Sequence, residues 1–278
     1  DRDTHLTRAS ALQKLLAAAG RADVPLALGI ASWGVRSARL ESQQLFGERG
    51  AAAQGAQEEG VRVMIDVIES SPEPLTLLSI GPLCNVAAML EQAGDRIAAK
   101  VHFVSMQGSI FRGYGDSGGP SPEHNVVCDP AACARALAAP WLSRPLLAPL
   151  DTCGVVQLQG PLFQRLHGCG VGLVRVLLEA HSAWLRHSKA AKLYYQDLDG
   201  DQASTVLFDT LAAFLALQPD GGGLLELRGL RLRATADGRT LPTETGSEVL
   251  CAVEWREGGL ARFKEHLVDT LTGRSANL

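Results

Sequence analysis

The sequence lacks the features that mark three large classes of protein. Its apolar stretches all fall short of the ~20 residues that a membrane-spanning helix needs, so a membrane protein is not expected. A net charge of −4, only three Tyr and no long basic run leave nucleic-acid binding without an electrostatic footprint. The first ten residues are polar and contain no apolar core of a signal peptide. They also lack an initiator Met, which favours a fragment or a processed product.

Paired cysteine motifs are absent as well. The six Cys are scattered along the chain, and none forms the Cys-x-x-Cys pair that is typical of zinc sites. In a chain of 278 residues we interpret them as reduced, buried thiols of an intracellular protein, in preference to disulfides or zinc ligands. We therefore expect a cytoplasmic location.

What the sequence does contain is an alternation of helical and strand-like segments. Helical periodicity marks the segments 7–19, 61–69, 85–93 and 131–138. Apolar runs between them predict strands at 24–30, 75–80, 100–106 and 143–150. This order predicts an α/β fold with a mainly parallel sheet, Rossmann-like, flanked by helices on both faces. The run at 75–80 is continuously apolar, so we expect that strand to be buried on both faces.

The second half of the chain is expected to be largely helical before it returns to the sheet. It contains a long amphipathic helix over 170–187. Strands are predicted at 224–234 and 249–254, with a closing helix at 260–271. No repeat or low-complexity linker interrupts the sequence, so we expect one domain over residues 1–278.

The stretch 121–130 combines a polar pair with a helix start. Glu123 and Asn125 are two apart, so in an extended segment their side chains point the same way. Asp129 and Pro130 predict a helix start, with Asp as the N-cap and Pro at the first helical position. A carboxylate and a carboxamide beside a glycine-rich loop suit a polyhydroxylated ligand such as a sugar. The alternative is an ordinary loop-to-helix junction.

Two groups of acidic residues suit a cation. Asp209 lies near the start of an apolar helix, where a buried carboxylate must be paired, hydrogen-bonded or bound to a metal. The alternative is an interaction with its own helix N-terminus. Asp197, Asp199 and Asp201 alternate as in a calcium loop, but the glycine and terminal Glu spacing of an EF-hand is missing. A solvated loop is therefore favoured for these three.

Five separated segments carry recognisable motifs. They are Ile-Gly-Pro-Leu-Cys-Asn at 80–85, Met-Gln-Gly-Ser at 106–109, Glu-His-Asn-Val-Val-Cys-Asp-Pro at 123–130, Pro-Leu-Asp-Thr at 149–152 and Phe-Asp-Thr-Leu-Ala at 208–212. In order and spacing these motifs resemble those of the inosine-uridine-preferring nucleoside hydrolases, a family of calcium-dependent N-ribohydrolases with an α/β fold. The resemblance covers most of the chain, from about residue 7 to residue 272.

The resemblance implies a hydrolase that cleaves the C1′–N bond of ribonucleosides through an oxocarbenium-like state, in purine and pyrimidine salvage. Glu123 and Asn125 would hold ribose hydroxyls, and Met106 would line the sugar. By the same resemblance, Asp209 and the carbonyl oxygen of Ile80 would be metal ligands. Such an all-oxygen ligand set suits calcium and not zinc. Beyond the ribonucleoside, the expected partner is a second copy of the chain, in a homodimer or homotetramer.

The sequence also departs from the family pattern. The family opens with a strand that ends in Asp-x-Asp-x-x-x-Asp-Asp, which supplies most calcium ligands and the catalytic base. This motif is missing, so we expect an N-terminally truncated fold whose base lies upstream. Phe208 replaces the His that helps the leaving base depart in many members. Ser117 stands near where an Asn would contact the sugar, and residues 46–50 replace a His-Gly-x-x-Gly pattern. His124 would point to the opposite face of an extended segment and is interpreted as structural.

Three hypotheses for the function remain. The first is a nucleoside hydrolase whose N-terminal segment is missing from this sequence, so that catalysis by this exact polypeptide is not expected. The second is a catalytically degenerate homologue that binds a nucleoside or ribose, or acts as a partner subunit. The third is an unrelated α/β hydrolase, but the chain has no Gly-x-Ser-x-Gly elbow and no dinucleotide-binding glycine fingerprint. Without its first strand, the sheet is expected to expose the edge of the next one.

Overall fold

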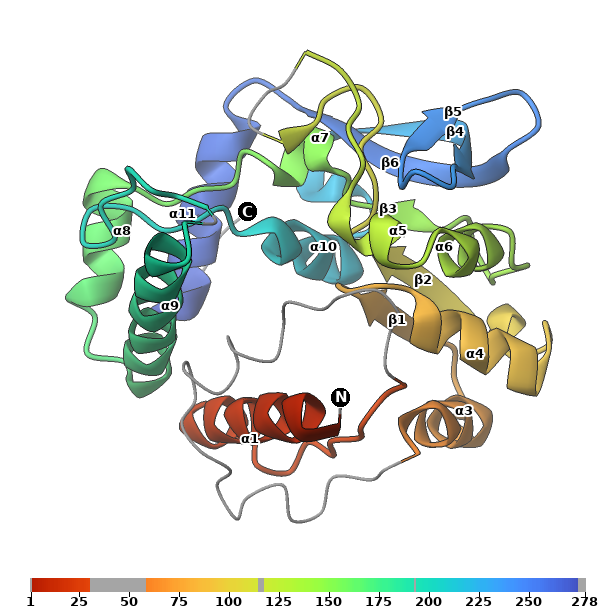
Figure 1. Ribbon diagram of the computed structural model, residues 1–278, viewed down its shortest axis with the longest axis horizontal. Helices are drawn as coiled ribbons and strands as arrows, with labels where there is room; N and C mark the ends of the chain where they lie inside the picture. Colours follow the sequence, from red (N-terminus) through yellow and green to blue (C-terminus); the bar gives the residue numbers. More distant parts are fainter. Residues whose placement is uncertain (1, 31–58, 115–117, 193, 275–278) are drawn as a thin grey trace.

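A sheet of six strands lies at the centre of the computed structural model, which describes residues 2–30, 59–114, 118–192 and 194–274 (Figure 1). The strands stand in the order β1-β2-β3-β6-β4-β5. Their bounds are Leu75–Ser79 for β1, Val101–Ser105 for β2, Leu146–Leu147 for β3, Leu225–Ala234 for β4, Thr240–Pro242 for β5 and Ser247–Trp255 for β6. Strands β1, β2, β3 and β6 pair in parallel, whereas β4 pairs antiparallel with both β6 and β5. The predicted mainly parallel α/β sheet is confirmed.

Helices cover both faces of this sheet, because successive residues of a strand point to opposite sides. Phe103 of β2 and Leu147 of β3 are buried in a core that includes side chains of α3, α4 and α6. Val104 and Leu146, one position away, are buried in a second core with side chains of α7, α10 and α11. The bounds of these helices are Gly60–Ser70 for α3, Cys84–Ala93 for α4, Pro130–Leu137 for α6, Leu150–Cys153 for α7, Phe208–Leu217 for α10 and Gly259–Leu271 for α11.

Helices α8 and α9 lie away from the sheet (Figure 1). A third core, which includes Phe163, Val174 and Val268, joins α8 and α9 to α11. Helix α1 packs against α9, below the sheet in Figure 1. The bounds are Arg2–Ala18 for α1, His124–Cys128 for the short α5, Gly160–His167 for α8 and Gly172–Ala190 for α9, and 3₁₀ turns occur at Ala98–Lys100 and Gly221–Gly223. The helices predicted at 7–19 and 170–187 are thus present as α1 and α9.

Two predicted strands differ from the structure. Residues 24–30 form no strand, and the Ile30 N–H donates to the side chain of Asn85 (2.8 Å) and not to a neighbouring strand. The strand predicted at 143–150 is reduced to the two residues of β3. Pro145 and Pro149 flank it, and proline has no N–H to give to a ladder of hydrogen bonds. An apolar run that contains proline therefore overestimates the length of a strand.

Strand β1 is not buried on both faces, so that prediction was wrong. Among the described residues, β1 pairs only with β2 and forms an edge of the sheet. Its Thr76 side chain is exposed, and the other four residues are only partly buried. Ile80, just beyond the end of the strand, is 48% exposed. The carboxyl end of β1 is therefore accessible, which matters for the site described below.

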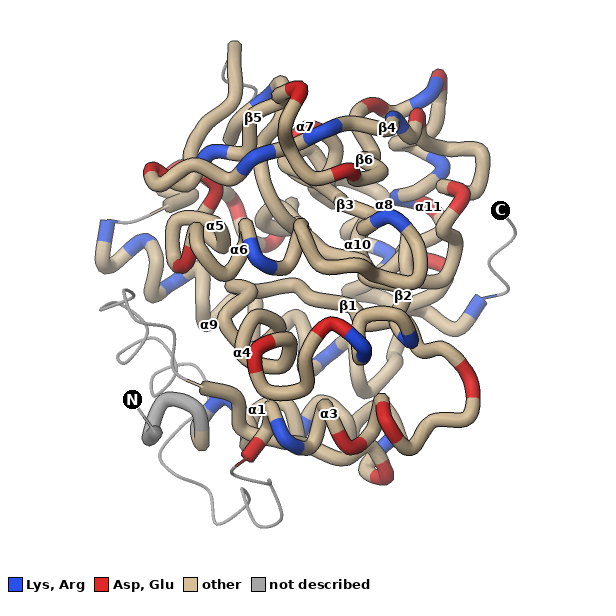
Figure 2. Tube along the Cα trace, turned by 90° about the vertical axis from the view of Figure 1, so that its right-hand side faces the viewer, with Lys and Arg blue, Asp and Glu red and all other residues tan. Residues whose placement is uncertain are grey.

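The expectation of buried thiols holds for four of the six Cys, whereas Cys128 and Cys169 are only partly buried. All six Cys are free thiols, and Cys84, Cys133, Cys153 and Cys251 are buried. Acidic and basic positions are interspersed along the chain, without a basic stripe in the described ranges (Figure 2). No helix in those ranges is long and apolar enough to cross a membrane.

Candidate functional site

The candidate site lies at the carboxyl ends of β1 and β2, where α/β sheets bind their ligands. Ile80 follows β1 and Met106 follows β2. The two strand ends are tied together, because the Met106 N–H donates to the carbonyl of Ser79 (3.0 Å). The Asn125 Nδ2 donates to the Met106 carbonyl (3.1 Å) and approaches its Sδ (3.4 Å). Three predicted site residues, Ile80, Met106 and Asn125, are therefore brought together.

Glu123 stands beside them as the N-cap of α5. Its carboxylate is only 1% exposed and accepts backbone N–H groups from Asn125 (2.8 Å), Gly108 (3.1 Å) and Val126 (3.3 Å). Burial raises the pKa of the Glu123 carboxyl, the three N–H groups oppose that rise, and the negative charge of Asp209 adds to it. A carboxylate has about four lone-pair sites, so roughly one remains free for a ligand.

The segment 121–130 is not extended, which corrects the sequence interpretation. Because Glu123 caps the helix, residues from His124 to Cys128 form α5, and Asn125 lies in its first turn. His124 therefore does not face away along a strand; its Nε2 lies 3.7 Å from the Cys128 Sγ, one helical turn later. Asp129 then caps α6, accepting the Ala132 N–H (2.9 Å), with Pro130 in the first turn, as predicted.

The loop after β2 is held by side-chain oxygens at five consecutive backbone N–H groups. Glu123 accepts from Gly108, and the Thr240 Oγ1 of β5 accepts from the Ser109 N–H (3.0 Å). The carboxylate of Asp151, in α7, accepts the next three backbone N–H groups, those of residues 110, 111 and 112, at 2.8, 2.7 and 3.1 Å. Asp151 is only 2% exposed. Gly108 is required here, because its φ is +85° and a Cβ would lie 2.4 Å from the Thr240 Oγ1. We call residues 108–112 the anchored loop.

Three motif residues that carried the sequence resemblance thus make structural contacts that the sequence did not reveal. Asp151 organises the anchored loop, and the neighbouring Thr152 Oγ1 donates to the Ala252 carbonyl of β6 (2.7 Å). Asn85, the last residue of the first motif, accepts the Ile30 N–H. In the sequence, the Pro-Leu-Asp-Thr motif marks the place of Asp151 but gives no sign of its contacts.

Asp209 lies in the first turn of α10 without a hydrogen bond or ion pair among the described residues. Helix α10 packs against both β1 and β2. Although the Asp209 side chain reaches solvent, the surrounding protein desolvates it and raises its pKa to about 6. The buried Cys153 lies within the electrostatic influence of Glu123, Asp209 and Asp151, and its thiol pKa is raised well above the usual value, chiefly by burial. Asp209 therefore belongs to the same neighbourhood as Glu123.

An aromatic pair joins the start of α10 to the segment that follows the anchored loop. The ring of Phe208 meets the ring of Tyr114 edge to face, with centroids 6.0 Å apart. The Tyr114 hydroxyl accepts the His124 N–H (3.0 Å), which links the anchored loop's continuation to α5. Partial burial raises the pKa of Tyr114 to about 12, so this phenol keeps its proton at neutral pH. Sequence reasoning did not single out Tyr114.

Gln107 is the most unusual polar group of the site. Its side chain is fully buried, and its Nε2 donates to the Gly81 carbonyl (2.8 Å), next to Ile80. Its Oε1 is buried without a hydrogen-bond partner. An unpaired buried oxygen is costly and calls for a donor or a cation.

The oxygen donors present fit a hard cation such as calcium in type. They are the Asp209 carboxylate, the Ile80 carbonyl and the orphaned Gln107 Oε1, and calcium prefers oxygen ligands, roughly six to eight of them. They form only part of such a shell, and the described residues contain no group of three or more His, Cys, Asp or Glu that could hold a metal. Asp197, Asp199 and Asp201 form no such group, and the Asp199 carboxylate accepts the Asp201 N–H in a local turn (3.0 Å).

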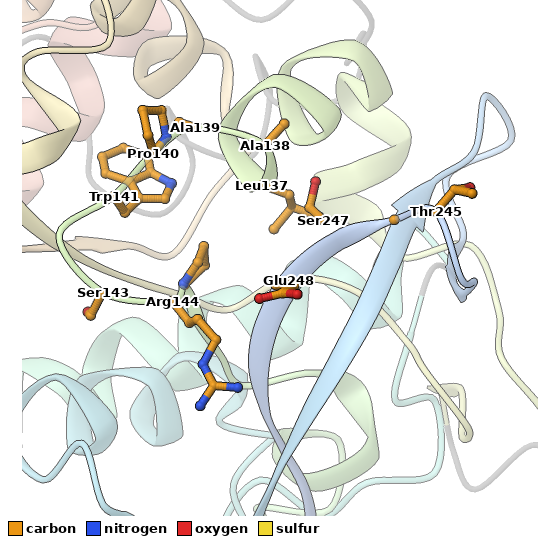
Figure 3. Close-up of a pocket in the computed structure, with 12 residues that line it drawn as sticks. Leu137, Ala138, Ala139, Pro140, Trp141, Ser143, Arg144, Thr245, Ser247 and Glu248 are labelled. Carbon is orange, nitrogen blue, oxygen red and sulfur yellow. The ribbon is translucent and has the colours of Figure 1, made fainter.

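Other parts of the chain lie apart from the site or outside the described ranges. Two of the predicted departures from the family pattern lie outside the described residues: Ser117, near where an Asn would contact the sugar, and residues 46–50, in place of a His-Gly-x-x-Gly pattern. A pocket of about 330 Å³ lies at the amino ends of β3 and β6, between Trp141, Arg144 and Glu248 (Figure 3). Since these strands run parallel to β1 and β2, this pocket is at the opposite end of the sheet from the candidate site.

Comparison with known proteins gives one family and one fold. The model of a family described as inosine-uridine preferring nucleoside hydrolase matches residues 3–267. A non-specific ribonucleoside hydrolase, RihC of Escherichia coli strain K12 / DH10B, is 35% identical over 121 residues, which span 41% of this chain and 38% of that protein. The matched region therefore spans well under half the length of this relative.

Solved structures of similar fold cover nearly the whole chain. A plant nucleoside hydrolase has a TM-score of 0.72 and 20% identity, covering 96% of this chain and 86% of its own. A purine-preferring ribonucleoside hydrolase from Gardnerella vaginalis has a TM-score of 0.73 and 17% identity, covering 96% and 85%. At these identities the likeness establishes the fold.

Proposed function

The chain belongs to the inosine-uridine preferring nucleoside hydrolase family, and we propose that it hydrolyses the N-glycosidic bond of ribonucleosides to ribose and free base. One observation carries this proposal: Met106, Glu123 and Asn125 converge at the carboxyl ends of β1 and β2, with Asp209 close enough to influence the Glu123 pKa. A sugar bound there would meet the hydrogen-bond acceptors of Glu123 and Asn125 and the negative charge of Asp209.

Asn125 and Glu123 are proposed to bind ribose hydroxyls. The Asn125 Nδ2 is engaged with Met106, and no described donor reaches its Oδ1, which is thus available to accept a sugar hydroxyl. Glu123 is fixed by its three N–H contacts, so any sugar hydroxyl it binds meets an acceptor that is already oriented. Such fixed acceptors strengthen their bonds as positive charge develops on the sugar ring in the transition state.

Calcium is the proposed cofactor, with Asp209 and the Ile80 carbonyl among its ligands. The support is the oxygen-only character of these donors and, within the described part of the chain, the lack of a hydrogen-bond or ion-pair partner for Asp209. Calcium bound there would lower the pKa of a bound water and help to generate the nucleophile. Asp209 holds the negative charge that attracts the cation, and the Ile80 carbonyl lies at an accessible strand end.

A second candidate function is a catalytically degenerate homologue that binds the nucleoside or serves as a partner subunit. The observation that favours it is the Glu123 carboxylate, which is 1% exposed and already bound to three N–H groups, as a purely structural cap would be. This alternative predicts nucleoside binding without release of free base.

The deciding experiment measures free base released from inosine and from uridine in the presence of calcium. We expect release by the full-length protein and a loss of at least about 100-fold when Asp209→Ala is introduced into it, because a metal ligand and its charge are removed. Asp197→Ala, an exposed carboxylate in the polar connection, is the matched control and should retain activity. Unchanged activity in Asp209→Ala would contradict the ligand assignment, and nucleoside binding without release would select the second candidate.

The setting of the activity is also proposed. Nucleoside salvage in the cytoplasm is consistent with six free thiols. We propose a homodimer or homotetramer, which sedimentation of the full chain tests directly.

A further inference from the structure

A cavity that shares no residue with the candidate site lies beyond the carboxyl end of β6. Its volume is about 500 Å³, within the roughly 300–1,000 Å³ that is usual for ligand pockets. The lining comes from the segment 157–162 that leads into α8, from Arg256 just after β6, and from one face of α11. Helices α8 and α11 pack against each other, on the left of Figure 1. Since β6 pairs in parallel with β3, and β3 with β2, this cavity lies at the edge of the sheet where α/β proteins bind ligands.

Two cationic side chains line this cavity without an acidic partner in the described ranges. Arg256 is fixed at the strand end, because its Nε donates to the Leu225 carbonyl (2.9 Å) and its backbone N–H to the Leu224 carbonyl (2.9 Å). No described acceptor is bonded to its two terminal nitrogens. Lys264 is partly buried, and this burial lowers the pKa of its ammonium group. A partly desolvated charge is costly without a counter-charge, so the pair calls for an anion.

Glu265, the acidic member of the lining, does not supply that anion. Its Oε2 accepts from the Arg165 Nη1 (2.7 Å), and Arg165 also forms an ion pair with Asp269. The Glu265 carboxylate is therefore directed to Arg165. The charges of Arg256 and Lys264 remain uncompensated within the described part of the cavity.

The rest of the lining suits the neutral part of a polar ligand. The Gln157 Nε2 donates to the Ser204 carbonyl (2.7 Å), which orients the amide and leaves its Oε1 as an acceptor. Gln159 is tied to Ala203 through its backbone, so its carboxamide is left for a ligand in the described part of the chain. Carboxamides both donate and accept hydrogen bonds, as the hydroxyl groups of a sugar require.

A phosphate monoester matches this lining better than a carboxylate does. It carries about −1.5 to −2 charge at neutral pH, close to the two positive charges of Arg256 and Lys264, whereas a carboxylate carries half as much. Arg and Lys are both common phosphate binders. We propose that the cavity binds a small phosphorylated sugar, with the phosphate between Arg256 and Lys264 and sugar hydroxyls on Gln157 and Gln159. This second ligand site uses no residue of the proposed hydrolysis.

The test is titration calorimetry of the full chain with ribose 5-phosphate as the probe. Lys264→Met keeps an unbranched apolar side chain and removes the charge. We expect it to bind ribose 5-phosphate about 10- to 100-fold more weakly, because a charge-assisted hydrogen bond to the phosphate is lost. Lys264→Arg keeps the positive charge and should bind the probe more tightly than Lys264→Met.

The matched control is Arg262→Met. Arg262 is exposed, two positions before Lys264 on α11, and it is not part of the cavity lining. This variant loses the same unit of charge from the same helix and should bind ribose 5-phosphate as the wild type does. Ribose is the second probe: it lacks the phosphate, so its binding at any site should not change in Lys264→Met. Thermal melting of each variant separates folding from binding.

Weaker binding in Lys264→Met alone supports the proposal. If Lys264→Met binds ribose 5-phosphate as tightly as the wild type, the phosphate binds elsewhere and the inference is wrong. An equal loss in Arg262→Met would show a general attraction to α11 and would also overturn it, as would no detectable binding by the wild type up to about 10 mM. If Lys264→Met does not fold, Arg256→Met is judged by the same criteria. Release of free base is measured separately, so the proposed function does not depend on these results.

Discussion

In the proposed hydrolase, Phe208 and Tyr114 would limit the help that a departing base can receive. Phe208 has no proton to give, and it contacts Tyr114, whose phenol is held by the His124 N–H and whose pKa is raised to about 12. A phenol with that pKa is a weak acid, so protonation of a leaving base from this position is unfavourable. The proposed hydrolase should therefore depend on how well its leaving group departs unaided.

Phe208→His is expected to raise kcat/KM for inosine by about 10-fold or more, because a positioned general acid contributes roughly 100- to 10,000-fold in favourable cases. Hydrolysis of a nitrophenyl riboside, whose leaving group needs no proton, should change little. The ratio of the two kcat/KM values is the measurement. A parallel change for both substrates would show that the substitution acts on the fold or on sugar binding and not on the leaving group.

The sequence predicted individual residues where their chemistry is local, and less well where it depends on distant contacts. Asp129 and Pro130 were recognised as a helix start because both residues have strong positional preferences. Glu123 was assigned to an extended segment, because Glu is not a usual N-cap and the Gly108 N–H that it also binds lies 15 positions away. Whether Met106, Glu123, Asn125, Asp209 and Ile80 bind ligands stays a prediction.

Among the elements, the anchored loop shows how the site is kept in shape. Its five N–H groups are bound by side chains of α5, β5 and α7, so the loop has no need of a strand or helix of its own. Asp151 carries three of these contacts in a buried setting. Sequence periodicity cannot reveal such a loop, because its hydrogen bonds run to side chains and not along a repeating backbone pattern.

Asp151→Ala is expected to lower the free energy of unfolding by about 3 kcal/mol or more, because it leaves three N–H groups without an acceptor at roughly 1–3 kcal/mol each, with some relief from solvent. Urea unfolding provides the measurement. Asp129→Ala, which removes one helix cap, should cost about 1 kcal/mol and serves as the control. Equal losses in the two variants would contradict the special role given to Asp151.

At the scale of the whole molecule, β1 forms an edge of the sheet among the described residues, and a sheet edge is a liability. A strand edge presents unpaired backbone groups to other chains, and the described residues place no strand beyond β1. The sequence predicted the parallel sheet and both helical layers because strands and helices alternate. It wrongly predicted that the strand at 75–80 is buried on both faces, because an apolar run alone does not tell a central strand from a marginal one. That residues 1–278 form a single domain stays a prediction.

Thr76→Lys is expected to slow aggregation of the full chain on heating, with a change in unfolding free energy within about 0.5 kcal/mol, because Thr76 is exposed and a charged edge resists pairing. Light scattering during thermal ramps measures the effect. His102→Lys is the matched control, since His102 is the exposed partner of Thr76 in the register with β2 but lies on an inner strand. If both variants aggregate like the wild type, association proceeds through another surface.

The contacts of the anchored loop also affect the order in which the protein folds. Its three anchors lie 15, 41 and 131 positions away in sequence, at Glu123, Asp151 and Thr240. Contacts of such high contact order form late, because a long stretch of chain must first be ordered. During synthesis the ribosome has to release the hairpin of β4 and β5 before the Ser109 amide can find its acceptor. The candidate site would thus mature last, and hydrogen exchange at residues 108–112 would report completion of the whole fold rather than of its neighbourhood.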